Sequence, residues 1–153
     1  MPRIDVKQVP VREGSSYPAP YDREVRARQK QRLGDAGGLS DFGVNLTRLP
    51  PGTWSSHRHW HSAEDEFVHV LSGELVLVTD AGEEILRAGD CAAFPKNSGD
   101  GHHLINRGAQ TATYLEIGTR TMGDICSYPD IDMHLDKSAG KGFTRKDGSD
   151  FSR

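Results

Sequence analysis

Three histidines at alternate positions, closely followed by acids, are the residues of this sequence best suited to do chemistry. In the stretch "SSHRHWHSAEDEF", from Ser55 to Phe67, they are His57, His59 and His61. Side chains two apart in a strand point the same way, so the three share one face if the segment is extended. Glu66 begins the next expected strand and can close a site of two histidines and one carboxylate. Such a set suits divalent iron, manganese, nickel or zinc and leaves coordination positions for a substrate.

The elements that must position this site lie between about residues 42 and 119, where most apolar residues are found. Short runs of β-branched or alternating residues are separated there by turn residues at hairpin spacing. The expected strands are Phe42 to Leu49, Glu66 to Leu71, Glu74 to Thr79, Glu83 to Leu86, Asp90 to Phe94, His102 to Asn106 and Thr111 to Gly118. So many short strands with tight turns predict an all-β sandwich or barrel, with the jelly roll as the first choice.

The two flanks differ from this middle in composition. Residues 1–38 are polar, charged and contain proline, and we expect an arm that is irregular or carries a short helix, with Arg23 to Arg32 as its helical segment. Residues 39–120 form the expected barrel. Residues 121–153 turn polar again and predict a loop-rich extension that packs on or beside the barrel. A chain of 153 residues fits one compact domain.

Charge and hydropathy argue against several classes of partner. The formal net charge of -3 offers no basic face for nucleic acid or an anionic membrane, and the charges of Arg23 to Arg32 are interpreted as a solvated helix face. No apolar run approaches the ~20 residues of a membrane span, and the first residues lack the apolar stretch of a signal peptide. We therefore expect a cytoplasmic protein. Cys91 and Cys126 lack CxxC spacing and are expected to be reduced packing residues.

The stretch "GTWSSHRHWHSAEDEFVHVLSG" resembles the first motif of the cupin superfamily, which is a glycine, HxH, a glutamate three or four residues later and a glycine after six more. With His59 and His61 as the HxH pair, Glu66 follows after four residues and Gly73 after six more. Gly52 lies one residue farther upstream than the pattern prefers.

A competing register starts the HxH pair at His57. It reaches Glu64 after four residues, but Gly73 then falls eight residues beyond Glu64. The register that begins at His59 matches both downstream spacings and is the one we adopt.

The stretch "GDCAAFPKNSGDGHHLIN" resembles the second cupin motif, which is a glycine, five residues, PxG, two residues, a histidine, three residues and an asparagine. Gly99 is followed by two residues, then His102, then three residues and Asn106. Two extra residues between the proline and Gly99 depart from the pattern. The choice between His102 and His103 therefore stays open, although the motif spacing favours His102.

The resemblance implies a jelly-roll barrel of the double-stranded β-helix type that holds one divalent transition metal ion, which is iron, manganese, nickel or zinc. It assigns His59, His61, Glu66 and His102 as the ligands. Aligned interior histidines would be costly unless they bound metal or were otherwise hydrogen-bonded, which agrees with this assignment. The resemblance also implies a homodimer, with residues 1–38 as an arm that covers a sheet edge.

The function expected from this site is a metal-dependent enzyme that acts on a small polar oxygenated substrate by isomerase, lyase or dioxygenase chemistry. Glu64 and His57 are the candidates to move a proton. A non-catalytic cupin that binds a small molecule or a metal is the alternative. A third possibility is a metal-free epimerase-like cupin that works through a histidine and a tyrosine. A proton-transfer group within reach of a bound ligand discriminates an enzyme from a binding module.

Overall fold

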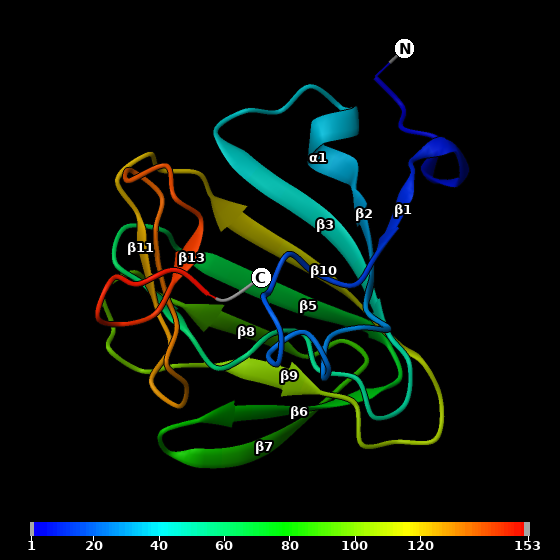
Figure 1. The fold of residues 1–153 in the computed structure, drawn as a ribbon. Coiled ribbons are helices and arrows are strands. Elements are labelled where there is room, and N and C mark those ends of the chain that lie inside the picture. The colour runs from blue at the N-terminus through cyan, green and yellow to red at the C-terminus, as the bar shows by residue number, and fades with distance from the viewer. Residues whose placement is uncertain (1, 152–153) are drawn as a thin grey trace.

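Strands dominate residues 2–151, which are the residues that the computed structural model describes (Figure 1). The strands are β1 (Val11–Glu13), β2 (Gln29–Arg32), β3 (Phe42–Leu49), β4 (Trp60–His61), β5 (Glu66–Ser72), β6 (Glu74–Thr79), β7 (Gly82–Arg87), β8 (Cys91–Phe94), β9 (His103–Ile105), β10 (Ala112–Thr119), β11 (Ile125–Ser127), β12 (His134–Asp136) and β13 (Phe143–Thr144). A 3-10 turn over Val6–Gln8 and the one-turn helix α1 (Leu33–Ala36) are the helical elements of this part of the chain. No helix of the described residues has the length and apolar character needed to cross a bilayer.

The strands form three antiparallel sheets. The largest has the order β1-β2-β3-β10-β5-β8, and the others have the orders β7-β6-β9 and β13-β12-β11-β4. Figure 1 shows β3, β10 and β5 side by side across the molecule, with β6 and β7 below them and β11 and β13 to one side. The prediction of an all-β barrel of the jelly-roll type is confirmed.

The hydrophobic core lies between the six-stranded and three-stranded sheets, and alternation along each strand selects its members. On β5, Val68 and Val70 point inward, and on β10 Tyr114 is fully buried. Full burial of an aliphatic side chain such as that of Val70 contributes roughly 1.5–3 kcal/mol. Glu66 shares the inward face of β5 with Val68 and Val70, because the side-chain period of a strand is two. The core face of β5 thus carries a carboxylate into the interior at its first residue.

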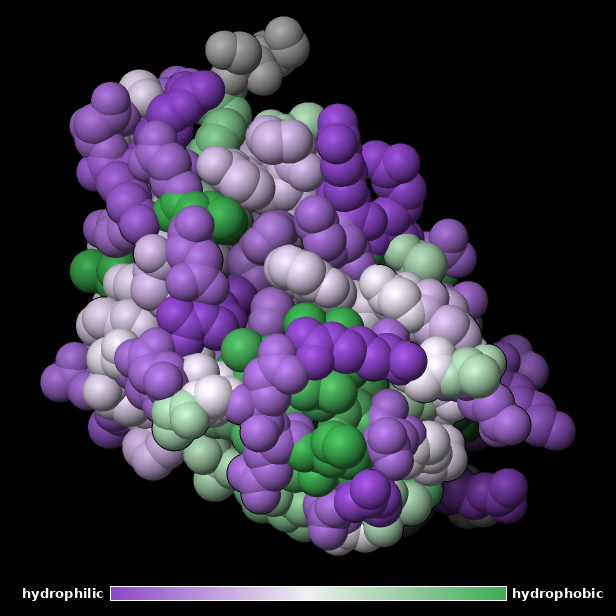
Figure 2. Space-filling view, turned by 90° about the horizontal axis from the view of Figure 1, so that it is seen from below, coloured by the Kyte–Doolittle hydropathy of each residue, from purple (hydrophilic) through white to green (hydrophobic). Residues whose placement is uncertain are grey.

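Apolar residues also occupy the outer face of the three-stranded sheet. Val76 lies opposite Ile85 on β7 and Ile105 on β9, so the three side chains share that face. Figure 2 views the molecule from this side and shows hydrophobic residues gathered within a hydrophilic border. The homodimer that the motif resemblance implies stays a prediction.

The predicted helix over Arg23 to Arg32 is wrong. Gln29–Arg32 form β2, which pairs with β3 on one side and with β1 on the other, and α1 begins only at Leu33. The edge of β3 offers unpaired backbone groups that β2 satisfies, and this tertiary pairing overrides local helix propensity. The arm therefore extends the largest sheet of the barrel.

The C-terminal extension is also built into a sheet. In this extension β11 pairs with β12, and β12 pairs with β13. The other edge of β11 pairs with β4, the short strand that precedes β5. This sheet buries Cys126, Tyr128 and Met133 in a second apolar cluster. The two cysteines are unpaired, with Cys91 exposed and Cys126 buried.

The turn between β5 and β6 requires Gly73 for two separate reasons, which a pair of substitutions can separate. Gly73 has φ +77, and an added Cβ would lie 2.8 Å from the Ala112 Cα. Gly99 has a similar φ of +74 but open space around it. We expect Gly99→Ala to lower the free energy of unfolding by about 1–2 kcal/mol through backbone strain. Gly73→Ala should lower the free energy of unfolding by about 1–3 kcal/mol more than Gly99→Ala does, because the backbone of β10 must move to make room for the new Cβ.

Urea unfolding of both variants measures this difference. Equal losses of stability would show that the close approach to Ala112 has no energetic consequence.

Candidate metal centre

Three imidazoles converge on the carboxylate of Glu66. Oε2 of Glu66 lies 2.6 Å from Nε2 of His102 and 3.6 Å from Nε2 of His59, and Oε1 lies 3.1 Å from Nε2 of His61. His59, Glu66 and His102 each place one ligand atom within 4.8 Å of the others. Ligand atoms that surround one ion at about 2.0–2.3 Å have separations of this size.

The backbone positions two of these histidines together. The N–H of His59 donates to the carbonyl of His102 at 3.2 Å, and the N–H of His102 donates to the carbonyl of His59 at 3.0 Å. This antiparallel bridge joins segments that are far apart in sequence and sets the two imidazoles side by side, with ring centroids 4.7 Å apart. The ring of His102 also stacks on Phe94 at a centroid distance of 3.6 Å.

Hydrogen bonds at Nδ1 orient two of the imidazoles. Nδ1 of His59 lies 2.8 Å from the carbonyl oxygen of His57, and Nδ1 of His61 lies 2.7 Å from Oδ2 of Asp124. When Nδ1–H donates in this way, the lone pair of the neutral ring is on Nε2, which faces Glu66. Asp124 is fully buried and also accepts from the Ala63 N–H at 2.9 Å.

The electrostatics of the site favour a cation between these groups. Burial opposes charge on Glu66, but the surrounding His59, His102 and His61 imidazoles outweigh it and hold its pKa well below the usual range. Burial likewise opposes protonation of His61, yet the carboxylates of Glu66 and Asp124 raise its pKa to about 9. Positive charge is therefore stabilised at His61, whereas burial and the neighbouring His59 and His61 lower the pKa of His102. The grouped donors are His59, Glu66 and His102, a set that fits divalent iron, manganese, nickel or zinc, and His61 contacts the same carboxylate from beside them.

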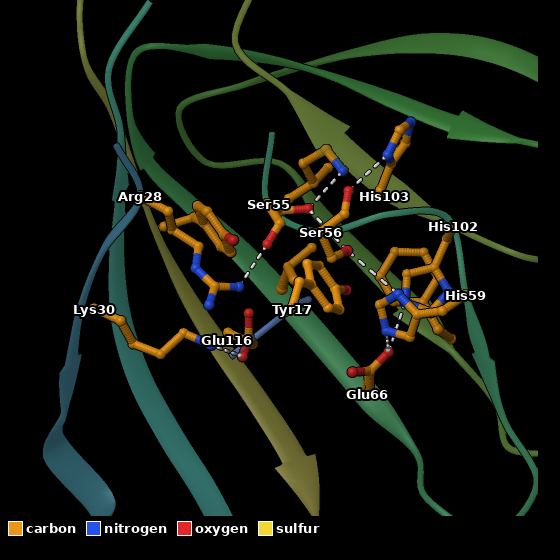
Figure 3. A pocket seen from close by; sticks show the side chains of 14 residues that line it. Tyr17, Arg28, Lys30, Ser55, Ser56, His59, Glu66, His102, His103 and Glu116 are labelled. Atoms are coloured by element: carbon orange, nitrogen blue, oxygen red, sulfur yellow. Dashed lines mark hydrogen bonds and ion pairs between the residues drawn. The ribbon is translucent and has the colours of Figure 1, made fainter. Parts of the chain in front are cut away.

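Three of these residues, His59, Glu66 and His102, border a cavity of about 190 Å³ inside the barrel, whereas His61 does not line it (Figure 3). His59, Glu66 and His102 lie on one side of it, and Arg28, Lys30 and Glu116 lie on the other. Pockets for drug-sized molecules usually span about 300–1,000 Å³, so this one suits a smaller molecule.

Between His102 and His103, the structure directs only the first toward Glu66. Nδ1 of His103 lies 2.8 Å from the carbonyl oxygen of Ser56, and its ring packs edge-on against Trp54 with centroids 4.8 Å apart. Burial lowers the pKa of His103 to about 4. His103 thus packs as a neutral residue on the strand face opposite that of its neighbour.

His57 does not share the face of His59 and His61, and that expectation is wrong. Residues 55–58 are bends, so the alternation of a strand does not reach His57. Its Nε2 donates to the carbonyl of Tyr21 at 2.7 Å, and its ring contacts Trp54. Its side chain does not line the cavity.

Glu64 is likewise absent from the lining of the cavity. Its Oε1 lies 2.6 Å from Nζ of Lys137, its Oε2 accepts from the Thr121 N–H at 2.8 Å, and Nδ1 of His61 is 3.8 Å away. Glu64 therefore lies behind His61, on the side of the ring that carries Nδ1. Direct proton transfer between Glu64 and a molecule in the cavity has no support in this geometry.

Sequence reasoning missed functional residues that come from the two flanks. Asp124 and Lys137 belong to the C-terminal extension, and Lys137 contacts Asp124 at 3.0 Å. Arg28 and Lys30 belong to the arm and reach the cavity because β2 is a strand of the barrel sheet. No spacing rule connects these residues to the histidines, since only the pairing of β2 and β11 brings them near.

Comparisons with known proteins agree with this geometry. The family described as the cupin domain matches residues 45–118. A solved structure from Silicibacter pomeroyi, a sugar phosphate isomerase of the cupin superfamily, is 49% identical, covers 99% of this chain and 97% of its own, and has a TM-score of 0.91. A structure from Acidithiobacillus ferrooxidans, provisionally named a sugar phosphate isomerase, is 31% identical over 83% of this chain and 81% of its own, with a TM-score of 0.74.

A polyketide cyclase from Streptomyces resistomycificus shares the fold at 21% identity, with a TM-score of 0.61 and coverage of 78% of this chain and 79% of its own. No curated protein matches the chain.

The Asp124 carboxylate should control metal affinity without being a ligand. We expect Asp124→Asn to weaken binding of zinc roughly 10–100-fold, because the amide no longer provides the charged acceptor that orients His61. Competition with a chromophoric chelator measures the affinity. Asp147→Asn is the matched control, since Asp147 is exposed and accepts only from the nearby Ser149 N–H. Equal affinities in the two variants would rule out this role for Asp124.

Proposed function

This chain belongs to the cupin superfamily, and from that premise we propose that it is a divalent-metal-dependent enzyme that isomerises a small polar oxygenated substrate. The observation that carries the proposal is the convergence of three imidazoles on the partly buried carboxylate of Glu66 at the wall of a small cavity. The choice of isomerisation over lyase or dioxygenase chemistry is supported by the 49% identical relative, which is described as a sugar phosphate isomerase.

In this proposal His59, His61, Glu66 and His102 hold the ion, which supplies Lewis-acid polarisation of a substrate carbonyl or hydroxyl group. Asp124 and the backbone carbonyl of His57 keep the imidazoles of His61 and His59 turned toward it.

Glu116 is the group that we propose as the general base. It lines the cavity, and its Oε1 accepts from Nζ of Lys30 at 3.1 Å and from Nδ2 of Asn45 at 3.2 Å. Burial opposes its charge, but the Lys30 ammonium outweighs burial and lowers the pKa of Glu116. The carboxylate is therefore ionised and can accept a substrate proton on Oε2, and Lys30 can stabilise the charge that develops.

His57 and Glu64, the candidates from the sequence, act in this proposal as positioning residues. The carbonyl of His57 accepts from Nδ1 of His59. Glu64 holds Lys137 against Asp124 and so supports the partner of His61.

A non-catalytic binding cupin is the second candidate, and the engagement of Glu116 by Lys30 and Asn45 is the observation in its favour. A carboxylate held in place by two neighbouring side chains can shape a pocket without moving protons. Turnover by the wild type and by a Glu116 variant distinguishes the two functions.

Metal content should follow the ligand set. We expect untagged wild-type protein to hold close to one equivalent of iron, manganese, nickel or zinc, and His59→Ala and His102→Ala to lose most of it, because each removes one donor. Elemental analysis of the purified proteins measures this. His69→Ala is the matched control, since His69 lies on β5 three residues from Glu66 and points to the opposite face. Absence of metal in the wild type, even after each ion is supplied, would refute the metalloenzyme.

Glu116→Gln should abolish turnover and leave metal content intact. We expect kcat for interconversion of aldose and ketose phosphates to fall roughly 10²–10⁴-fold, the usual effect of removing a general base. NMR of a panel of sugar phosphates incubated with metal-loaded protein detects the interconversion. Glu84→Gln on the exposed surface of β7 is the control and should retain wild-type activity. Unchanged kcat in Glu116→Gln would exclude Glu116 as the base.

A further inference from the structure

Arg28 lies in the wall of the cavity and has no carboxylate partner among residues 2–151. Its Nη1 donates to the Ser55 carbonyl at 2.7 Å and its Nη2 to the Gly14 carbonyl at 3.0 Å. Its Nε is buried and has no hydrogen-bond partner within the described part of the chain. None of the ion pairs among residues 2–151 includes Arg28. A guanidinium has five N–H donors, so charge and donors remain available to a bound group.

Arg28 and Lys30 also line a second hollow, a cleft of about 170 Å³. The remaining residues of this cleft are Arg12, Glu13, Gly14, Ser15, Ser16 and Arg32. Cations thus outnumber acids among its lining side chains. A basic cleft that shares two residues with the inner cavity attracts anions and directs them inward.

We propose that Arg28 binds an anionic group of the substrate, a phosphate or a carboxylate, at the side of the cavity opposite the metal ligands. Figure 3 shows Arg28 and Lys30 on one side, Glu66 with its imidazoles on the other, and Tyr17 between them. This inference rests on the proposed function for the reaction that the bound substrate undergoes. Arginine suits both kinds of anion, because its planar fork pairs with two oxygens at once.

The arrangement also limits the substrate. Lys30 is neutralised by Glu116 at 3.1 Å, so Arg28 alone contributes uncompensated positive charge. The cavity of about 190 Å³ admits a small molecule. The substrate class is therefore a small oxygenated molecule that carries one anionic group.

A purely structural role for Arg28 makes a different prediction. Its two bonds to carbonyl oxygens tie the arm, through Gly14, to the loop that contains Ser55. If Arg28 only holds these two segments together, it needs its hydrogen-bond donors but has no reason to bind an anion. Anion binding by the intact protein separates the two roles.

The test is calorimetric titration of the full-length, chelator-treated protein with inorganic phosphate and with acetate. Removal of metal ensures that neither anion binds to an ion, so the result does not depend on the proposed enzymatic function. We expect one of the anions to bind, and Arg28→Gln to weaken that binding at least tenfold. Arg26→Gln is the matched control with unchanged affinity, because the Arg26 side chain is 71% exposed and pairs with Asp22.

Tighter binding of phosphate would identify a phosphorylated substrate, and tighter binding of acetate a carboxylic acid. Binding of neither anion, or equal affinity in Arg28→Gln and the wild type, would overturn the proposal. If Arg28→Gln does not fold, wild-type crystals soaked in phosphate decide the question. A parallel soak in acetate covers the carboxylate case: density for either anion beside Nε of Arg28 supports the site, and the absence of both there refutes it.

Discussion

The charge of Glu66 is the constraint on which the rest of the structure depends. A carboxylate at the start of a core-facing strand is costly in a protein interior unless positive charge and hydrogen bonds surround it. His59, His61 and His102 supply that environment. His59 lies in the loop before β4, His61 on β4 itself, and His102 at the end of the loop before β9. Glu66 therefore remains ionised only when all three of these segments are in place.

The compensation of charge continues outward from Glu66 along one chain of contacts. His61 lies between Glu66 and Asp124, Asp124 contacts Lys137, and Lys137 contacts Glu64. Acidic and basic groups alternate along this series of contacts, so each charge in the series has a partner of opposite sign. The C-terminal extension contributes two of these five groups, Asp124 and Lys137, which explains why the barrel alone does not complete the site.

The barrel strands could be predicted from the sequence because their determinants are local. The predicted ends of β3 and β6 agree with the structure, and those of β5, β7 and β10 differ by one residue. The convergence of His59, Glu66 and His102 also follows from motif spacing, since those residues flank strands whose register is set by the core.

The parts of the fold and of the site that were not predicted from the sequence depend on contacts between distant segments. The helix expected over Arg23 to Arg32 gave way to pairing of β2 with β3, and the pairing of β4 with β11 brought Asp124 to His61. His57 was misplaced because bends interrupt the segment before β4. Local patterns contain no information about which edge a flanking segment will pair with, so Arg28, Asp124 and Lys137 could not be identified.

The antiparallel bridge between His59 and His102 has a consequence for the order in which the protein is made. The ribosome releases Arg28 first, His102 later and Lys137 last of the three. A nascent chain that ends before residue 102 lacks both the partner of His59 and the imidazole nearest to Glu66. The candidate site therefore cannot assemble until residues 102 and 137 have both left the ribosome, however early the strands of the barrel pair.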